Sequence, residues 1–253
     1  MREDIKSYTI SGMGCSASAL AIDITQNIFK SHKDSIAVVL STEILSTESK
    51  NRAKYELVKT LRTQRAYDDK GYFSAYREED TDGYTGVTLK RNLLETAGET
   101  LRSNITILGS QILPFTEKIL YGVSILKKKM VDKKSSVDIY VPNFKSVINH
   151  FCLPTSGRAV INEIGKGLNL GESDMEAALM TLHRFGNQSS SSLWYELAYL
   201  EAKERVKKGD KVWMLGMGSG PKCISIIWEC IRPICGEAQR GPWADSIDGY
   251  PLG

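Results

Sequence analysis

Six residues near the N-terminus, 12–17, have the composition of a nucleophile site. The sequence GMGCSA places two glycines around Met13 and then Cys15, directly before a predicted buried helix over residues 17–30. A cysteine at a helix N-terminus ionises more readily, because the helix dipole and the free N–H groups of the first turn stabilise a thiolate. The glycines allow a substrate to approach the backbone closely. Spacing alone leaves two interpretations open, a nucleophile or a buried structural cysteine beside a turn.

A second polar group lies in the run LHRFGNQSSSS, residues 182–192. Asn187 follows a predicted helix and precedes small residues, so its amide could donate a hydrogen bond to a carbonyl oxygen. The alternative is a helix end followed by a serine-rich cap. His183 lies four residues before Asn187, which is about one helical turn.

The third feature is the glycine-rich turn GMGSG, residues 216–220. The backbone N–H groups of Gly218, Ser219 and Gly220 could line an oxyanion pocket, although a lone glycine-rich turn is a weak signal. The turn is not a nucleotide-binding Walker loop, because no Lys-Ser or Lys-Thr pair follows at the required spacing. We expect no cofactor.

Hydrophobic periodicity predicts a mixed α/β protein with buried strands. The predicted helices are 17–30, 89–102, 115–130, 158–166, 174–185 with Ser173 as its N-cap, and 193–207. The predicted strands are 35–41, 147–153, 211–217 and 223–230, the last two joined by the GSGPK turn, and 55–62 is a strand or a short helix. Residues 44–51 are polar and featureless, and 67–86 have the composition of a loop.

The composition is that of a globular protein. Of the 253 residues 42% are hydrophobic and 25% charged, which excludes a disordered chain and allows one large domain or two small ones. The net charge of +3 and the lack of a basic stripe with interleaved aromatics argue against a nucleic-acid partner. No apolar run approaches the roughly 20 residues that span a bilayer. We therefore expect that the chain as given does not cross a membrane.

The cysteines are odd in number and lie far apart or in apolar surroundings, without C-x-x-C spacing. They are Cys15, Cys152, Cys223, Cys230 and Cys235. We expect neither a disulfide framework nor a metal site, and a reducing compartment fits best. The lysines at 127–129, 133 and 134 form either a solvated connection or a surface that attracts anionic lipid or the phosphates of CoA.

Four blocks, GMGCSASALAIDI, LHRFGNQSSSSLWYELAYLEAKERVKKGDKVW, GMGSGPKC and GPWADSIDGYP, closely resemble plant very-long-chain 3-ketoacyl-CoA synthases. These condensing enzymes of fatty acid elongation belong to the thiolase-like superfamily, with the chalcone synthases. The resemblance implies a layered α-β-α-β-α fold with an incomplete N-terminal half. Residues 1–134 would form the remainder of that half, with the nucleophile and a helical insertion, and 135–253 the C-terminal half.

The resemblance also implies a decarboxylative condensation of a long-chain acyl-CoA with malonyl-CoA. Cys15 would take the acyl group as a thioester, and Asn187, with a histidine, would hold the malonyl thioester carbonyl while the enolate forms. Gly218, Ser219, Gly220 and His150 would border the substrate and the oxyanion. The implied partners are a second copy or a related synthase and other elongase components, and the implied location is the cytosolic face of the endoplasmic reticulum membrane.

The chain departs from the family at its catalytic histidine. The family block resembles FCIHAGGRAVI, whereas residues 151–161 read FCLPTSGRAVI, so Pro154 stands in the histidine position. Proline has no donor, acceptor or titratable group in its side chain. His150 is four residues away, about 13 Å along a strand, so His183 is the better substitute. Both are otherwise structural histidines, and His32 is expected at the surface.

Two segments are also expected to be missing. The family has a few dozen residues between the blocks matching 41–43 and 52–58, and its membrane-spanning helices and first strands precede the cysteine block. Three functions stay open: a condensing acyltransferase, an impaired member that at most binds acyl groups as a non-catalytic partner, and a thioesterase that loses its acyl group to water.

Overall fold

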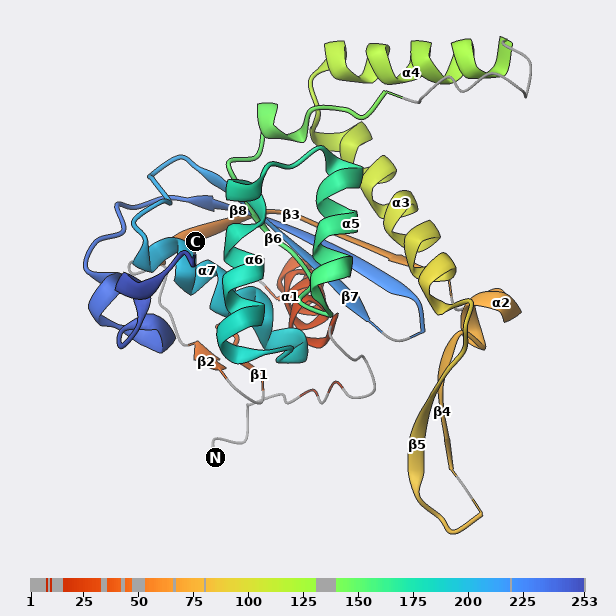
Figure 1. The fold of residues 1–253 in the computed structure, drawn as a ribbon, viewed down its shortest axis with the longest axis horizontal. Coiled ribbons are helices and arrows are strands. Elements are labelled where there is room, and N and C mark those ends of the chain that lie inside the picture. The colour runs from red at the N-terminus through yellow and green to blue at the C-terminus, as the bar shows by residue number, and fades with distance from the viewer. Residues whose placement is uncertain are drawn as a thin grey trace.

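A four-stranded sheet is the centre of the computed structural model (Figure 1), with the strand order β3-β8-β7-β6. Its strands are β3 (Tyr55–Gln64), β6 (His150–Cys152), β7 (Lys211–Gly218) and β8 (Lys222–Cys230). β6 runs parallel to β7, and the other two pairs are antiparallel. The structure describes residues 8, 10, 16–32, 36–41, 44–46, 53–65, 67–79, 81–130, 140–218 and 220–252.

Helices cover both faces of this sheet. On β7, Val212 and Met214 belong to one buried cluster, and Trp213 and Leu215 belong to the other. A strand that is apolar on both sides must be covered on both sides. The first cluster contains residues of α1 (Ala17–Ser31) and α7 (Ser192–Ala202), and the second contains residues of α3 (Leu93–Ile112) and α5 (Arg158–Leu168). α6 (Glu172–Phe185) contacts α5, α7 and β6, so it closes the sheet edge (Figure 1).

A β-bulge at Val58 decides which residues of β3 face each layer. The register of β3 against β8 shifts between Leu57 and Lys59, so the alternation of side chains reverses there. After the bulge, Thr60 Oγ1 donates to Asp23 Oδ1 on α1, at 2.9 Å, and Thr63 lies on the opposite face beside α3. One strand therefore bonds to a helix of each layer.

The remaining elements lie outside this central body. They are the strand pair β1 (Val39–Ser41) and β2 (Ile44–Ser46), α2 (Asp69–Tyr72), the hairpin of β4 (Ala75–Glu79) and β5 (Thr85–Leu89), and α4 (Phe115–Met130). Short 3-10 helices span Phe144–Ser146, Ser189–Ser191, Glu237–Gln239, Gly241–Trp243 and Ile247–Gly249. Among the described residues, no helix is both long enough and apolar enough to cross a membrane.

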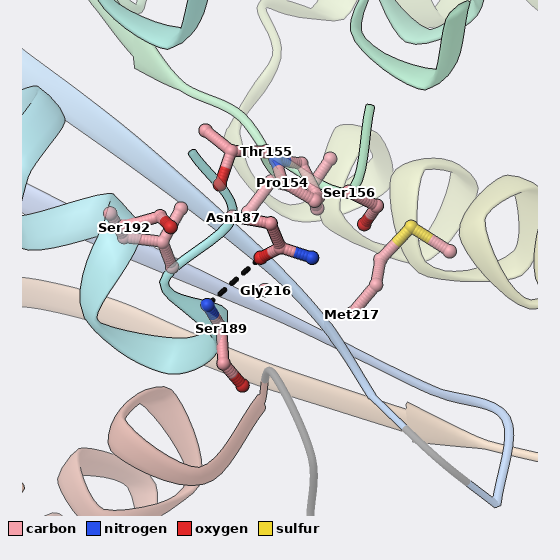
Figure 2. A pocket seen from close by; sticks show the side chains of 10 residues that line it. Pro154, Thr155, Ser156, Asn187, Ser189, Ser192, Gly216 and Met217 are labelled. Carbon is pink, nitrogen blue, oxygen red and sulfur yellow. Dashed lines mark hydrogen bonds between the residues drawn. The ribbon is translucent and has the colours of Figure 1, made fainter. Parts of the chain in front are cut away.

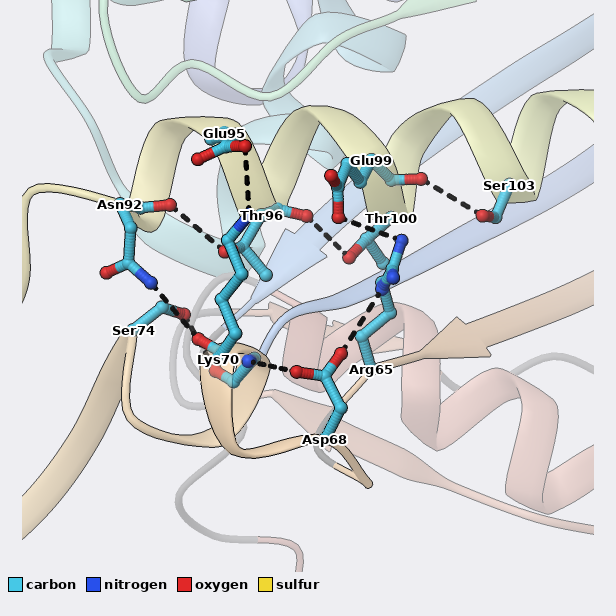
Figure 3. Close-up of polar contacts among 11 residues, drawn as sticks. Arg65, Asp68, Lys70, Ser74, Asn92, Glu95, Thr96, Glu99, Thr100 and Ser103 are labelled. Carbon is cyan, nitrogen blue, oxygen red and sulfur yellow. Dashed lines mark hydrogen bonds and ion pairs between the residues drawn. The ribbon is translucent and has the colours of Figure 1, made fainter.

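Ion pairs fix α2 and the turn before it to the first turns of α3 (Figure 3). Arg65 Nη1 lies 3.0 Å from Glu99 Oε2, and Lys70 Nζ lies 2.8 Å from Glu95 Oε1. Gly71 has no room for a side chain, because a Cβ there would lie 2.2 Å from the carbonyl oxygen of Arg65. The turn from β3 into α2 therefore requires glycine at this position.

Most of the predicted elements are confirmed within a few residues. The predicted bounds 115–130 are those of α4, and α1, α5, β7 and β8 differ from prediction by one or two residues at an end. Residues 55–62 lie in a strand, β3. His32 is the exposed C-cap of α1, as predicted.

Several predictions were wrong. Residues 67–86 contain a helix and most of a hairpin, because the acidic, glycine-bearing stretch supplies only the turn, where Gly83 has a φ of +83°. α3 begins at Leu93, since residue 89 ends β5, and it runs ten residues beyond the predicted end. β1 and β6 are shorter than the predicted strands 35–41 and 147–153. β2 occupies part of the segment 44–51, for which no element was predicted, and α7 ends at Ala202 instead of at residue 207. α6 is capped at Gly171, whose N–H donates to Asp174, instead of at Ser173.

The division at residues 134 and 135 lies in 131–139, outside the described residues, and stays a prediction. β3 comes from the first predicted half, and it pairs with β8 from the second. The two halves therefore share one sheet in the part of the chain that the structure describes.

Asn104 is a fully buried polar residue that joins α3 to the middle of this sheet. Its Nδ2 donates to the carbonyl oxygens of Leu61 and Cys223, at 3.2 and 3.1 Å, and its Oδ1 accepts from Ser225 Oγ at 2.5 Å. A buried carbonyl without a partner costs free energy, so the asparagine fixes α3 to one position along β3 and β8.

We predict that Asn104→Ala lowers the free energy of unfolding by about 2–4 kcal/mol, because several buried polar groups lose their partner together. Urea unfolding followed by circular dichroism measures this. Asn162→Ala, at an exposed position of α5, is the matched control and should change stability by less than about 0.5 kcal/mol. Equal effects of the two substitutions would contradict the role of Asn104.

Candidate functional site

A small hollow lies where the C-terminal ends of β6 and β7 meet the loop after α6 (Figure 2). Its volume of about 10 Å³ is close to the room that one water molecule needs. Cys152 pairs with Met214 in the parallel register, so the segment that follows β6 leaves the sheet beside the continuing end of β7. The lining residues are Pro154, Thr155, Ser156, Asn187, Ser189, Ser192, Leu193, Leu215, Gly216 and Met217.

Asn187 presents an amide donor to this hollow. Its Oδ1 accepts a hydrogen bond from the backbone N–H of Ser189 at 2.8 Å. An N–H group can bond only to the oxygen of an amide, so the orientation of the side chain is fixed and Nδ2 is the outward group. Figure 2 shows this nitrogen pointing toward Ser156 and Met217. Such a fixed donor can hold a carbonyl oxygen that gains negative charge.

The backbone at Gly186 turns the chain from α6 into this loop. Its φ of +71° and ψ of −160° belong to a region that residues with a Cβ almost never occupy. The helix therefore ends at Phe185, and Asn187 is presented by the loop instead of by the helix.

The N-terminus of α1 is bonded to the same loop. Ser18, in the first turn of α1, donates through Oγ to the backbone oxygen of Ser190 at 2.7 Å. Ser192, the first residue of α7, accepts at Oγ from the N–H of Gln188 at 3.1 Å. Two helix N-termini thus approach the loop that carries Asn187, and their partial positive charges favour an anion there.

Gly216 allows α1 and α7 to rest together on β7. A Cβ at this position would lie 3.4 Å from Ala19 Cβ on α1 and 3.7 Å from Leu193 Cδ1 on α7. A methyl group would just touch both helices, and any larger side chain would push them from the strand. The close approach of the helices to the hollow therefore depends on a small residue in β7.

The predicted nucleophile, Cys15, lies outside the described residues and stays a prediction. Its neighbour Ser16 is described and buried, directly before α1. Burial raises the pKa of the thiols of Cys152 and Cys223, so both stay protonated at neutral pH and are poor nucleophiles. Among the described residues, no group of three His, Cys, Asp or Glu side chains is arranged to hold a metal ion.

Pro154 is buried and lines the hollow beside Asn187. An imidazole at this position would face the amide of Asn187 across the hollow. None of the described lining residues is titratable. The described part of the lining therefore offers an anion the helix N-termini and the amide, without a charged side chain.

His150 is at the other end of β6 from the hollow. Its Nε2 lies 3.0 Å from Asp210 Oδ2, and it pairs in the register with Val212. Asp210 also accepts from the backbone N–H of Lys207 at 2.8 Å, so this histidine joins the start of β6 to the turn before β7. It is not among the residues that line the hollow.

His183 is likewise absent from the lining. It is exposed on α6, and its Nδ1 lies 3.1 Å from Tyr250 Oη. α6 ends at Phe185, between His183 and Asn187, so helical spacing no longer determines how the two side chains are placed. Gly218 and Gly220 belong to the end of the β7–β8 hairpin, beyond Gly216 and Met217, and Ser219 lies outside the described residues. The functional roles of these five residues stay predictions.

Comparison with known proteins decides the family. A family model described as FAE1/Type III polyketide synthase-like protein matches residues 1–49 and 45–130, which is half of the chain. The chain belongs to this family. A second model, 3-Oxoacyl-[acyl-carrier-protein (ACP)] synthase III C terminal, matches residues 145–230.

Curated relatives of this FAE1-like chain are plant proteins. It is 43% identical to 3-ketoacyl-CoA synthase 4 of Arabidopsis thaliana and 40% identical to 3-ketoacyl-CoA synthase 6, over 282 aligned positions each. The alignments cover all of this chain, 54% of the first protein and 56% of the second. The chain therefore spans about half the length of these relatives. The predicted resemblance is confirmed.

Two solved structures confirm the predicted thiolase-like α/β fold. The 3-oxoacyl-[acyl-carrier-protein] synthase III of Aquifex aeolicus VF5 is 17% identical with a TM-score of 0.54, covering 90% of this chain and 68% of that one. A fungal type III polyketide synthase, ORAS, is 14% identical with a TM-score of 0.60, covering 91% and 66%. At such identity the likeness concerns the fold alone.

The alignments also agree with the predicted internal gap. They are 282 positions long for a chain of 253 residues, so the relatives carry residues that this chain lacks. The two pieces of the family match meet at residues 45–49, between the two blocks that border the predicted gap.

Glu196 is a buried acid of this FAE1-like chain that our sequence analysis missed. It lies on α7 without exposed surface, and its Oε2 accepts from the backbone N–H of Leu153 at 2.7 Å. Burial raises the pKa of Glu196 well above its ordinary value, although the bond from Leu153 opposes this, so the fold favours the protonated form. The residue fixes the segment that carries Pro154 into the hollow. A single acid in the apolar run SLWYELAYL was the available signal.

We predict that the stability of Glu196→Gln relative to the original chain rises with pH. Gln keeps an acceptor for Leu153, whereas Glu loses stability as the pH rises above its unfolded pKa, because the unfolded carboxyl ionises while the folded one holds its proton. The stability difference in favour of Gln should grow above about pH 5, by up to about 1.4 kcal/mol per pH unit, until the folded carboxyl also ionises.

Urea unfolding at several pH values measures the difference. Glu163→Gln, which removes an exposed carboxyl group from α5, is the matched control. An advantage of Glu196→Gln that stays constant with pH would show that Glu196 is ionised in the folded chain.

Proposed function

We propose that this chain is a condensing acyltransferase that joins a long-chain acyl-CoA to malonyl-CoA, with loss of carbon dioxide, in very-long-chain fatty acid elongation. The observation that carries this proposal is the 2.7 Å hydrogen bond between Ser18 and Ser190. It ties the helix that follows Cys15 to the loop that presents Asn187. The names of the plant relatives, 3-ketoacyl-CoA synthases, give the same reaction class.

The first step of the proposed reaction loads the nucleophile. The thiolate of Cys15 attacks the carbonyl carbon of the acyl-CoA thioester, the carbon–sulfur bond to CoA breaks, and CoA leaves as a thiolate. The N-terminus of α1 directly follows Cys15 and favours the anionic form of its sulfur.

The second step forms the carbon–carbon bond. Malonyl-CoA loses carbon dioxide, and the electron pair of the broken bond becomes an enolate whose oxygen accepts from Asn187 Nδ2. The enolate carbon attacks the carbonyl carbon of the acyl-cysteine, and the sulfur of Cys15 leaves as a thiolate. The product is a 3-ketoacyl-CoA two carbons longer than the acyl group that was loaded.

Pro154 limits the second step more than the first in this proposal. An enolate oxygen held by one donor is less stabilised than one held by two, and the removal of a donor from such a site typically costs about 10²–10³-fold in rate. Loading depends on the thiolate of Cys15 and on the helix N-termini, which proline leaves in place. In the same proposal, Gly218, Ser219 and Gly220 border the CoA thioesters. His150 and His183 do not touch the substrates, and they affect the site only by holding in place the segments that they connect.

The wider context is part of the same proposal. We infer action at the cytosolic face of the endoplasmic reticulum membrane, with other elongase components, as a homodimer or a heterodimer with a related synthase. The plant relatives support the elongase context.

We predict that incubation with a long-chain acyl-CoA adds one acyl group to the chain, on Cys15. Intact-mass spectrometry and peptide mapping measure it. Radiolabelled malonyl-CoA should then give a labelled 3-keto product, which Cys15→Ala reduces by at least about 10³-fold, as the loss of a catalytic nucleophile does. Cys235→Ala, at an exposed cysteine, is the matched control and should leave the product unchanged. An unmodified Cys15 would refute the acyltransferase proposal, and hydrolysis of the acyl-CoA without malonyl-CoA would identify a thioesterase.

We predict that Pro154→His raises the condensation rate by about 10²–10³-fold, because the imidazole adds a second donor at the enolate oxygen. The rate of acyl loading should change much less, so the two steps are measured separately, by mass spectrometry and with labelled malonyl-CoA. Pro154→Ala removes the ring and adds the same backbone N–H as histidine does, but no side-chain donor, so it is the control. If Pro154→Ala raises the condensation rate as much as Pro154→His does, removal of the proline ring is sufficient, and the proposed role of an imidazole donor is wrong.

A further inference from the structure

The side of α4 that faces solvent is its apolar side. Phe115, Ile119, Val123, Leu126 and Met130 recur at helical spacing, within about 80° of the helix circumference, and all five are exposed. Solvent-facing helix surfaces are ordinarily polar, so an exposed apolar stripe of this kind indicates a binding surface for an apolar partner.

The opposite side of α4 is the one that holds it to the protein. Glu117 Oε2 accepts from Tyr140 Oη at 2.9 Å and from the backbone N–H of Asn143 at 2.8 Å. Ser124 lies on this side too and is half-buried. These bonds fix the rotation of α4 so that its polar side is turned to the returning chain and the apolar stripe is turned outward. Figure 1 shows α4 at the edge of the molecule, away from the sheet and its covering helices.

Lysines flank the apolar stripe. Lys127 is exposed and lies about 40° from Val123, between Val123 and the exposed Leu120, and the half-buried Lys118 lies about 60° beyond the other border of the stripe. The single acid of α4, Glu117, is bonded on the opposite side. An apolar helix face with cations along its borders fits an interface in which lipid tails lie below anionic head groups, because lysine side chains reach up to the phosphates while the stripe is immersed.

We propose that α4 is a membrane-contacting helix that lies in the surface of an anionic bilayer, with the stripe from Phe115 to Met130 inserted below the head groups. The helix is about 24 Å long and carries several charges, so it lies in the surface and does not span it. A second copy of the chain is a poorer occupant. Two copies that pair through the same face bring their own flanking lysines together, with no acid on that face to offset them. This inference does not depend on the proposed acyl transfer.

Flotation of the full chain with phosphatidylcholine vesicles, with and without phosphatidylserine, tests the proposal. We expect binding to the anionic vesicles, and a marked decrease when salt rises from about 0.1 M to about 1 M and the screening length falls from about 10 Å to about 3 Å. Equal binding to both kinds of vesicle, or none to the anionic ones, would overturn it.

Phe115→Ser with Met130→Ser should weaken binding by at least about tenfold, because two inserted apolar side chains are lost. The matched control is Ile36→Ser with Tyr67→Ser. These residues are 83% and 81% exposed, against 75% and 85% for Phe115 and Met130, and lie outside α4. Equal losses from the two pairs would overturn the proposal. So would sedimentation that shows a dimer for the original chain and a monomer for the α4 pair.

Charge gives a second test within the same helix. Lys127→Glu places an acid beside the stripe and should weaken binding to anionic vesicles about fivefold or more. Lys128→Glu makes the same change on the opposite side, about 100° further around the helix, and should have a clearly smaller effect. Equal effects of the two would show general electrostatic attraction without insertion of this face, and the proposal would fail.

Discussion

The contact between α1 and the loop after α6 is the interaction on which the site depends. Ser18 and Ser190 are 172 positions apart in the chain, and the hydrogen bond between them joins the segment of the predicted nucleophile to that of the predicted amide donor. Gly216 permits this contact, because its missing side chain lets α1 and α7 rest on β7 together. A site assembled from such distant segments exists only when the sheet and both helices have folded.

The polar groups buried around the hollow act on the backbone more than on a substrate. Glu196 holds the segment after β6, and Asn104 holds α3 to the strands beneath it. Glu196 accepts from the backbone N–H of Leu153, just beyond the end of β6, and Asn104 donates to backbone oxygens of β3 and β8. Buried backbone groups must be paired. The hollow is small, and the described residues that line it are uncharged. Its electrostatics come from backbone dipoles and amides.

Sequence reasoning succeeded where one strong local pattern determined the outcome. The periodicity of α4 and the apolar runs of β7 and β8 predicted the bounds of these elements closely. Asn187 was predicted to follow a helix end, and it lines the hollow there. It failed where a single backbone angle decides the geometry. Gly186 ends α6 between His183 and Asn187, so helical spacing does not relate the two side chains. The role of Glu196 was hidden because it depends on Leu153, which is 43 positions away.

The bulge at Val58 explains how this chain can lack a segment that its relatives have. The missing residues lie before β3, whereas the register of β3 is determined after the bulge, by Thr60 against α1 and by Thr63 against α3. Removal of residues upstream changes the length of the chain that enters the strand, but not which side chains the strand presents to each layer. A deletion before the bulge leaves the faces of the later β3 residues unchanged. A deletion of one residue at the bulge would turn every later side chain of β3 to the opposite face of the sheet.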